Sequence, residues 1–555
     1  MTLPLPQARY PDERPNDLRE KLPIDSPHVF EKRNPATEGL VGQYAVALWP
    51  EVDAAIKHAS RHQPAWQANP PQQRALVLRT AAKLLYAQRH ALAECVAAET
   101  GKTTAEALLA EITPAIAWLN YCAQHAPKWL KPQPATSVLQ RLVGQSAVLY
   151  PRAYGTIAVI TPWNYPLGIS VSGLASGLMA GNAVIYKPSE LAPETGLALA
   201  ELFKTALLEA TKNEANTELI QLVLGDARTG EALIHHPELQ GVLFTGSEST
   251  GRAIERALRP QGKPVWLELG GNDAMVVLPG ACETQDALDA IASNAFWGRM
   301  TNAGQTCSAV KRLYVHEADA DALAACLADK ANQLNQSRML MPLISRDAQR
   351  KIITQVEDAL DNGAVALAGG YALEGPGYYY PATILCDMLP QARVLQEEVF
   401  GPVLPVIRYS TPQAAIDEIN QNNLGLSASI FGPLAQAESL AGKITSGMVS
   451  LNTLPHSNYG MAHLPWTGWG RSGPGVSHGK AGLLALTRIQ VINQTARPKK
   501  QPWFYPASLT PEKDSTARLA NAMAGLLHSK NPLASLKHIL LLGWSVVSNR
   551  STTRL

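Results

Sequence analysis

The sequence predicts an α/β protein in which a doubly wound, Rossmann-type sheet domain is followed by a second domain of the same class. Two observations predict this fold. Short apolar runs closed by Gly or Pro recur between residues 155 and 246, with helix-length segments between them. Runs that are apolar throughout are typical of strands buried on both faces of a parallel sheet. A second series of such runs follows between residues 274 and 407.

Composition and charge limit the classes to which this protein can belong. At 555 residues the chain is too long for one ordinary domain of about 100–200 residues, so we expect two or three domains. Hydrophobic residues make up 46% and charged residues 17%, which is typical of a soluble globular protein. The net charge of +2 gives no sign of the concentrated basic surface that nucleic-acid binding requires, so nucleic acid is not an expected partner.

The cysteines and the N-terminus predict the compartment in which the protein works. Its six cysteines form no C-x-x-C pair and no Cys/His cluster at metal-ligand spacing, so we expect reduced thiols and no metal site. The first 14 residues lack the apolar segment of a secretory signal peptide. We therefore expect a cytoplasmic protein.

The predicted order of elements is helices first and two sheets afterwards. The first 50 or so residues are Pro-rich and predict irregular structure, and Val52, Ile56 and Ala59 then begin a helical layer. The expected strands of the first sheet are residues 155–162, 181–188, 219–225 and 241–246, with a helix at 193–210. Those of the second sheet are residues 274–278, 312–315 and 403–407.

The chain after residue 494 differs in composition from the rest. Residues 497–502 predict a linker and residues 515–550 one or two helices. The most apolar stretch, 539–547, is far shorter than the ~20 apolar residues that span a bilayer. The favoured interpretation is a helix docked on the protein or on a partner subunit. The alternative, suggested by Trp544 beside the leucines, is a helix in a membrane interface.

Two residues beside glycine turns are candidates for covalent chemistry. Cys307 lies in a Gly-containing turn before an apolar strand, where an exposed thiol could attack a carbonyl carbon. Glu268 ends a strand-like run before two glycines, where its carboxylate could act as a general base. Taken singly, Cys307 is more often an inert buried thiol, and Glu268 more often a structural carboxylate.

Asn164 and several residues at strand ends are candidates for contacts with a bound group. Asn164 follows a predicted strand, where ligands bind in open α/β sheets, and could donate its amide to an oxyanion. Capping the next helix is an equally good interpretation of Asn164. Lys187 and Glu190 follow another strand and could bind the two hydroxyls of a ribose, and Ser247, before a predicted helix, could bind a phosphate.

Two short motifs match known patterns but lack the structural context of those patterns. Residues 468–473 have the spacing G-x-G-x-x-G of a dinucleotide-binding loop, yet no β-rich run precedes them and Pro-Gly follows. Residues 475–479 have the spacing G-x-S-x-G of a hydrolase nucleophile elbow, yet no buried strand precedes Ser477. We expect neither motif to perform the role that its pattern suggests.

Six motifs together resemble the aldehyde dehydrogenase superfamily, in which they occur in the same order. The resemblance extends over roughly residues 33–500, and six matches in order are highly specific; a weaker likeness is to the branch with class 3 and fatty aldehyde dehydrogenases. The motifs are Thr161-Pro-Trp-Asn-Tyr-Pro166, Lys187-Pro-Ser-Glu190, Phe244-Thr-Gly-Ser247, Glu268-Leu-Gly-Gly271, Gly304-Gln-Thr-Cys307 and Glu397-Glu-Val-Phe-Gly-Pro-Val403.

The resemblance implies a role for each candidate residue. It implies that Cys307 is the nucleophile, that Glu268 activates water, and that Asn164 donates to the oxyanion together with the Cys307 N–H. It also implies an NAD(P) cofactor, bound without the usual glycine fingerprint. The implied cofactor contacts are Ile160, Thr161, Pro162, Trp163, Asn164, Lys187, Ser189, Glu190, Gly225, Thr245, Gly246, Ser247, Glu268, Leu269, Gly270, Glu398 and Phe400.

The implied reaction is the oxidation of an aldehyde to the carboxylic acid. Cys307 would add to the aldehyde, a hydride would pass to the cofactor, and water activated by Glu268 would hydrolyse the thioester. Glu190 would accept from a ribose 2′-hydroxyl and repel a 2′-phosphate, so NAD is favoured over NADP. The scarcity of charge near Trp163, Trp297 and Leu464 to Trp466, together with the apolar tail, favours a hydrophobic aldehyde.

The resemblance also implies an oligomer and a division into domains. A homodimer is favoured over a tetramer, and the C-terminal extension could touch a membrane surface. The expected parts are an NAD(P)-binding domain (1–136 and 155–270), a catalytic domain (271–474), oligomerisation strands (137–154 and 484–495) and a C-terminal extension (496–555).

Overall fold

The computed structural model shows two compact units. One consists of Met1–Pro132 and Tyr150–Gln490, and the other of Gln133–Leu149 and Val491–Leu555. The residues that the structure describes are 29–142, 144–337, 339–457, 462–498 and 515–528.

The first sheet of the larger unit has five parallel strands in the order β7-β6-β5-β8-β9. The chain runs from β5 outward to β7 and returns to the other side of β5, which is the doubly wound arrangement that the sequence predicted. Because the strands are parallel, their carboxyl ends lie along one edge. They are β5 (Thr156–Ile160), β6 (Ala183–Lys187), β7 (Ile220–Leu222), β8 (Val242–Thr245) and β9 (Val265–Glu268).

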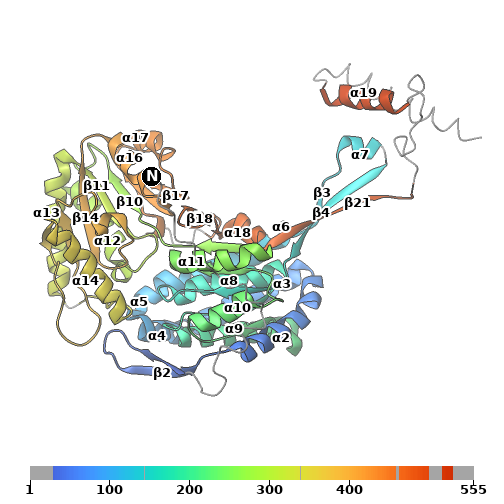
Figure 1. Cartoon of the computed structure of the whole chain (residues 1–555), viewed down its shortest axis with the longest axis horizontal. Helices are drawn as coiled ribbons and strands as arrows, with labels where there is room; N and C mark the ends of the chain where they lie inside the picture. Colours follow the sequence, from blue (N-terminus) through green and yellow to red (C-terminus); the bar gives the residue numbers. More distant parts are fainter. Residues whose placement is uncertain (1–28, 143, 338, 458–461, 499–514, 529–555) are drawn as a thin grey trace, which may run out of the picture. The chain divides into compact units, whose positions relative to one another are not determined.

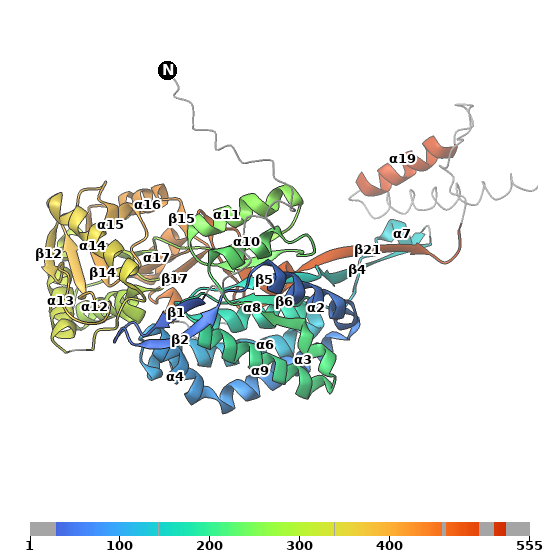
Figure 2. The same ribbon diagram turned by 60° about the horizontal axis from the view of Figure 1, so that its bottom comes forward.

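Helices cover both faces of this sheet, so every residue of β5 and β6 is buried. Helices α8 and α9 lie on one face and α10 and α11 on the other (Figures 1 and 2). The helical elements of this part are α2 (Trp49–Ala68), α3 (Pro71–Ala87), α4 (Arg89–Thr100), α5 (Thr104–Ala107), the π-helical turn η1 (Leu108–Ile112), α6 (Thr113–Trp129), α8 (Pro166–Ala180), α9 (Pro193–Thr211), η2 (Glu214–Leu219), α10 (Ala227–His235), α11 (Glu248–Leu258) and η3 (Arg259–Gln261).

Two strands precede the helical layer, so the expectation of irregular structure up to residue 50 was wrong for this segment. β1 (Val29–Arg33) and β2 (Leu40–Ala45) pair in antiparallel fashion. The turn between them is closed by Asn34, whose side-chain oxygen accepts from the Ala36 N–H at 2.8 Å. The Pro-rich composition, which is typical of turns, concealed the short strands on either side of this one.

The second sheet has seven strands in the order β12-β13-β14-β11-β10-β16-β17, all parallel to their neighbours except β12. Alternate residues of β10 face opposite cores, because Val277 packs with helices α12 and α13 and Val276 with α16 and α17. The second α/β region is therefore confirmed. Its elements are β10 (Ala274–Val277), α12 (Gln285–Met300), β11 (Arg312–His316), α13 (Glu317–Gln336), α14 (Arg346–Asp361), β12 (Val365–Ala368), β13 (Thr383–Cys386), α15 (Arg393–Gln396), β14 (Val403–Tyr409), α16 (Pro412–Gln421), β16 (Ser427–Phe431), α17 (Leu434–Ala441) and β17 (Met448–Leu451).

Short elements complete the larger unit beside the two sheets. β18 pairs with β20, and β15 with β19, each in antiparallel fashion. These elements are η4 (Thr301–Gly304), β15 (Leu424–Gly425), η5 (Pro455–Ser457), β18 (Trp466–Thr467), β19 (Trp469–Gly470), β20 (Val476–Ser477) and α18 (Gly479–Ala485).

A three-stranded sheet of order β21-β4-β3 contains the segments for which strands were predicted before residue 155 and after residue 484. A helix also begins at residue 515, as the sequence predicted. In the described part of the chain, no helix is both long and apolar enough to cross a membrane. Residues 539–547 lie outside that part. The elements are β3 (Gln133–Pro134), α7 (Val138–Leu142), β4 (Gln145–Ala153), β21 (Thr487–Thr495) and α19 (Ser515–His528).

Candidate functional site

The predicted site residues of the first sheet gather at one edge. Ile160, Lys187, Thr245 and Glu268 are the last residues of β5, β6, β8 and β9. In an open α/β sheet this edge is the usual place for a ligand. The other predicted residues that follow these strands or β7 directly are Thr161, Pro162, Trp163, Asn164, Ser189, Glu190, Gly225, Gly246, Ser247, Leu269 and Gly270.

Cys307 lies in a loop that a left-handed turn separates from helix α12. Asn302 has a φ of 51° and Gly304 a φ of 73°. Glu106 holds the turn, because its Oε1 accepts from the Asn302 N–H at 2.9 Å. A Cβ on Gly304 would lie 2.2 Å from the carbonyl oxygen of Gly401, so a side chain would overlap backbone there. The turn therefore needs glycine at this position.

Cys307 and Glu268 line one cavity of about 230 Å³. Of the hydrophobic residues named from the sequence, Leu464 and Trp466 line this cavity, whereas Trp297 lines a second, apolar cavity of about 420 Å³. The apolar side chains around the Cys307 cavity include Trp118, Ile169, Met448, Leu464 and Trp466.

Burial raises the pKa of both acidic groups in this cavity. The pKa of the Cys307 thiol rises to about 12, mainly because of burial and further because of the nearby Glu268 carboxylate. Burial likewise raises the pKa of Glu268 to about 7, although the polar side chains of Ser477, Thr245 and Trp466 act in the opposite direction. A carboxyl group with this pKa is about half ionised near neutral pH, which suits proton transfer.

Lys311 is a buried cation beside Cys307 that the sequence did not single out. Its Nζ donates to the carbonyl oxygen of Thr306 at 3.1 Å and to that of Cys307. It also lies 3.3 Å from Glu398 Oε1, which accepts from the Gly271 N–H. The positive charge of Lys311 lowers the pKa of the thiol. A lysine before an apolar strand is an ordinary sequence feature, so only the fold reveals this contact.

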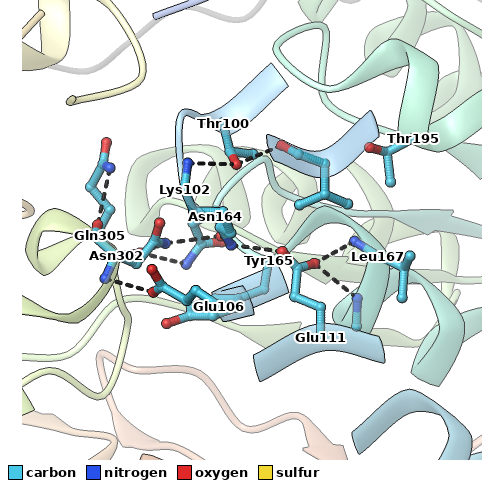
Figure 3. Close-up of polar contacts among 12 residues, drawn as sticks. Thr100, Lys102, Glu106, Glu111, Asn164, Tyr165, Leu167, Thr195, Asn302 and Gln305 are labelled. Atoms are coloured by element: carbon cyan, nitrogen blue, oxygen red, sulfur yellow. Dashed lines mark hydrogen bonds and ion pairs between the residues drawn. The ribbon is translucent and has the colours of Figure 1, made fainter. Parts of the chain in front are cut away.

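Asn164 is held against the loop that carries Cys307 (Figure 3). Its side-chain N–H donates to the carbonyl oxygen of Gln305 at 3.1 Å. The backbone carbonyl oxygen of Asn164 accepts from Lys102 Nζ at 2.8 Å and from Asn302 Nδ2 at 3.0 Å. Two segments that are far from Asn164 in the sequence, at Lys102 and at residues 302–305, therefore fix the position of this asparagine.

The interpretation of Asn164 as the cap of helix α8 was wrong. Glu111, on the π-helical turn η1, caps the helix instead, because its Oε2 accepts from the N–H groups of Leu167 and Gly168 at 2.8 and 3.2 Å. Glu111 Oε1 also pairs with Lys102 Nζ at 2.6 Å, with both side chains fully buried. The sequence did not identify this pair, because its partners only meet after folding.

Lys187 is a buried cation at the edge of the first sheet that has few partners of its own. Within the described residues, Lys187 Nζ donates only to the carbonyl oxygen of Pro188, at 3.5 Å, so two N–H donors remain for a ligand. Burial lowers the pKa of Lys187, and the carboxylates of Glu190 and Asp226 oppose this shift. Such a cation between carboxylates suits the hydroxyl groups of a ribose.

The predicted residues of the second sheet domain meet those of the first. Trp163 and Phe400 make an edge-to-face ring contact with centroids 5.6 Å apart. Gly270 is packed so closely that a Cβ there would lie 2.1 Å from Glu398 Oε2. Ser247 is the N-cap of α11 and accepts from the Thr250 N–H at 3.4 Å. Phe400 and Glu398 thus lie beside residues that follow β5 and β9.

Comparison with known proteins identifies the family. The model of the aldehyde dehydrogenase family matches residues 23–492. The chain is 34% identical over 503 residues to an NADP(+) succinate-semialdehyde dehydrogenase of Deinococcus radiodurans, covering 89% of this chain and 98% of that protein. It is 34% identical over 484 residues to a 4,4'-diapolycopene aldehyde oxidase of a Methylomonas species, covering 86% and 88%.

A solved structure gives the same result for the fold. The aldehyde dehydrogenase of Bacillus cereus, in its NAD+ complex, superposes with a TM-score of 0.78 at 28% identity, covering 85% of this chain and 94% of that one. The relatives include both NAD and NADP enzymes. The chain belongs to the aldehyde dehydrogenase family and is an NAD(P)-dependent enzyme that oxidises an aldehyde.

Proposed function

We propose that Cys307 is the nucleophile of this aldehyde oxidation, Glu268 the general base and Asn164 an oxyanion donor. One observation carries the proposal: Cys307 and Glu268 line the same cavity. Asn164 supports it, because its amide is anchored to the carbonyl group two residues before Cys307. The family membership supplies the reaction, and these contacts support the assignment of its residues.

The residues act in order on the aldehyde. The Cys307 thiolate, favoured by the charge of Lys311, adds to the aldehyde carbon. The Asn164 amide and the Cys307 backbone N–H donate to the oxyanion, each contributing roughly 3 kcal/mol in the transition state. An NAD(P) cofactor held by Lys187 and the other residues that follow the strands of the first sheet would supply the hydride acceptor. Glu268 then removes a proton from water, which attacks the thioester and releases the carboxylic acid and the Cys307 thiolate.

A burst experiment tests this assignment. Cys307→Ala should abolish NAD(P)H formation, because no covalent adduct forms. Glu268→Gln should still form one NAD(P)H per active site and then stop, since the thioester is not hydrolysed. Rapid mixing with aldehyde, followed by absorbance of the reduced cofactor, measures both phases. Turnover by Cys307→Ala would refute the proposal, and aldehyde consumption without NAD(P) would favour a hydrolase that uses Cys307.

NAD is proposed as the preferred cofactor, because a carboxylate follows Lys187 at the edge of the first sheet. Glu190, three residues after Lys187, would accept from a ribose 2′-hydroxyl and repel a 2′-phosphate. Glu190→Gln should therefore raise kcat/KM for NADP relative to NAD, while Lys187→Met should weaken both. The ratio of the two kcat/KM values measures the preference, and a wild-type ratio in favour of NADP would contradict it.

The aldehyde is proposed to be hydrophobic. Trp118, Ile169 and Met448 line the cavity beside Cys307 and offer no charge to a polar substrate. Apolar lining of this kind favours a substrate that buries hydrocarbon against it. A panel of aliphatic, aromatic and semialdehyde substrates should give the highest kcat/KM with the apolar members. A preference for a carboxylate-bearing semialdehyde would contradict this proposal.

A further inference from the structure

The motif Gly475-x-Ser-x-Gly479, for which the sequence offered no role, lies directly beside Glu268. The Gly475 N–H donates to the Leu267 carbonyl oxygen at 2.8 Å, and a Cβ on Gly475 would lie 2.4 Å from that oxygen. Only glycine lets the two backbones approach so closely. This contact places Ser477 beside Glu268, and the Ser477 hydroxyl donates to Glu268 Oε2 at 3.4 Å.

His478 continues this chain of contacts away from Glu268. Its Nδ1 lies 3.1 Å from the Ser477 hydroxyl oxygen, and its Nε2 lies 3.4 Å from the hydroxyl oxygen of Ser172 on α8. Its ring also packs edge-on against Trp118, with centroids 4.9 Å apart. His478 lines the same cavity as Cys307. Both ring nitrogens thus have a partner: Nδ1 contacts Ser477, on the side of Glu268, and Nε2 contacts Ser172, on the opposite side.

The backbone of His478 has a conformation that is unfavourable for histidine. Its φ is 61° and its ψ is 168°, a combination that glycine adopts almost alone. The next residue, Gly479, also has a positive φ, of 59°. A strained side-chain-bearing residue persists where the surroundings hold it, and such residues cluster at functional sites. The strain therefore points to a use of the His478 side chain that glycine would not provide.

We propose that Ser477 and His478 are positioning residues that orient Glu268 and carry away the proton it takes from the hydrolytic water. This inference rests on the proposed role of Glu268. After Glu268 has taken that proton, its carboxyl group donates to the Ser477 oxygen and the Ser477 hydroxyl donates to His478 Nδ1. A concerted shift moves one proton along each bond, and the Nε2 proton passes to the neighbouring Ser172 hydroxyl, which gives up its own proton to solvent.

The proton balance of this step restores Glu268 and Ser477 and leaves His478 in its other tautomer. Glu268 becomes a carboxylate again, Ser477 keeps one hydroxyl proton, and the imidazole changes from the Nε2–H to the Nδ1–H tautomer, which returns to the Nε2–H form by proton exchange with water before the next turnover. No charge is left on the ring, which suits its environment, because burial lowers the pKa of His478 to about 4. The groups around Ser477 and His478 are Ser172 from α8, Trp118 from α6 and, beyond Glu268, the Cys307 thiol.

The test compares the burst of NAD(P)H with the steady state in Ser477→Ala and His478→Ala. Both variants should keep the rate and size of the burst, since hydride transfer precedes hydrolysis, and should lose at least about tenfold in steady-state turnover. His125→Ala, on α6 and away from Glu268, is the matched histidine control and should resemble the wild type. Equal loss in both phases, or no loss in either, would overturn the proposal.

A glycine variant separates the role in proton transfer from a role in stability. His478→Gly removes the strain, so its thermal midpoint should be at least that of the wild type and above that of His478→Ala. Its steady-state turnover should nevertheless fall as in His478→Ala, and added imidazole should restore part of it. A His478→Gly enzyme with wild-type turnover would refute the proposal.

Glu268→Gln provides the reference that distinguishes failure of the proton relay through Ser477 and His478 from failure of the proposed general-base role of Glu268. If Glu268→Gln shows a burst and the Ser477 and His478 variants behave as the wild type, only the relay fails. If Glu268→Gln shows no burst or keeps full turnover, the assignment of the general base fails and the relay fails with it.

Discussion

Glu268 shows at the scale of one residue how burial raises the pKa of a carboxyl group to near neutral pH. It ends a strand, as the sequence predicted, but its pKa of about 7 depends on side chains that arrive from elsewhere in the chain. Desolvation disfavours the charged carboxylate, and the hydroxyl of Ser477 only partly offsets this effect. The resulting carboxyl group can both take and release a proton near neutral pH.

The pH dependence of turnover should report this pKa. Glu268 is a base only when it is ionised, so the steady-state rate should rise with pH and reach half its maximum near pH 7. The NAD(P)H burst should follow a different profile, because it depends on the Cys307 thiol. A steady-state rate that was constant between about pH 6 and about pH 8 would contradict this expectation.

The stability of Glu268→Gln should also depend on pH. Because the folded pKa of about 7 exceeds the ordinary value of 4.5, the folded state binds more protons than the unfolded state between these pH values. The contribution of Glu268 to stability is therefore fully present below pH 4.5 and is lost as pH rises through 7. Glu268→Gln should exceed the wild type in free energy of unfolding by on the order of 3 kcal/mol at about pH 8 and by less at about pH 5. Urea denaturation at the two pH values measures the difference, and an equal difference at both would contradict it.

At the scale of elements, the π-helical turn η1 links the helical layer to the loop that carries Cys307. Glu111 on η1 caps α8 and pairs with Lys102, and Lys102 in turn donates to the carbonyl group of Asn164. A buried pair gains little net stability over apolar residues, but the loss of one partner leaves an uncompensated charge. The pair therefore matters mainly because it places Asn164.

Lys102→Met should destabilise the protein by about 3–5 kcal/mol, because the Glu111 carboxylate remains buried without its cation. Adding Glu111→Gln should restore part of this loss, since the amide oxygen still accepts from α8 and no charge is left. The single variant should lower kcat more than it raises KM, because Asn164 loses a hydrogen bond. Urea denaturation and steady-state kinetics measure both effects. A double variant less stable than Lys102→Met would contradict the expectation.

Gly304→Ala should destabilise the loop before Cys307. The φ of 73° alone costs a non-glycine residue about 1–3 kcal/mol, and the added methyl group would overlap the Gly401 carbonyl oxygen as well. Gly442→Ala is the matched control, because its φ of −69° suits any residue and nothing lies within 4 Å of the added Cβ. Thermal unfolding measures the midpoints of both variants, and that of Gly304→Ala should be the lower. Equal midpoints would contradict this expectation, because they would mean that the loop can shift freely.

The strands of the first sheet and three strands of the second could be predicted from the sequence, whereas the surroundings of the site residues could not. Residues 155–162 and 274–278 are apolar runs with turn residues at their ends, and such local patterns survive in the folded protein. Lys311 and Glu111 show no such pattern. Their roles arise from contacts with Glu398 and with α8, which the chain reaches only by tertiary packing.

At the scale of the whole molecule, strand β21 exposes an apolar row. Ile489 and Val491 are 58% and 60% exposed. Alternate apolar residues on an exposed strand mark a surface that pairs with another chain. We therefore propose a homodimer or larger homo-oligomer that uses this strand, as the family resemblance implies.

Val491→Lys should shift the protein toward a smaller species in size-exclusion chromatography with light scattering. Charge repulsion between copies and loss of apolar contact would both weaken the interface. Val365→Lys on β12, where valine is 45% exposed, is the control and should leave the mass unchanged. A wild-type protein that is monomeric at all concentrations would contradict the proposed oligomer. The domain boundaries and the cytoplasmic location stay predictions.

The sequence by itself determined the parallel first sheet, three strands of the second, and the strand ends that carry Glu268 and Asn164, because periodicity and turn residues act over short stretches of chain. The order of six motifs added the family. Only the tertiary structure decided which groups surround those residues: Lys311 beside the thiol, Glu111 at the start of α8, and Ser477 behind the carboxylate. Burial and hydrogen bonding set the pKa and orientation of a side chain, and both depend on segments that meet only when the chain has folded.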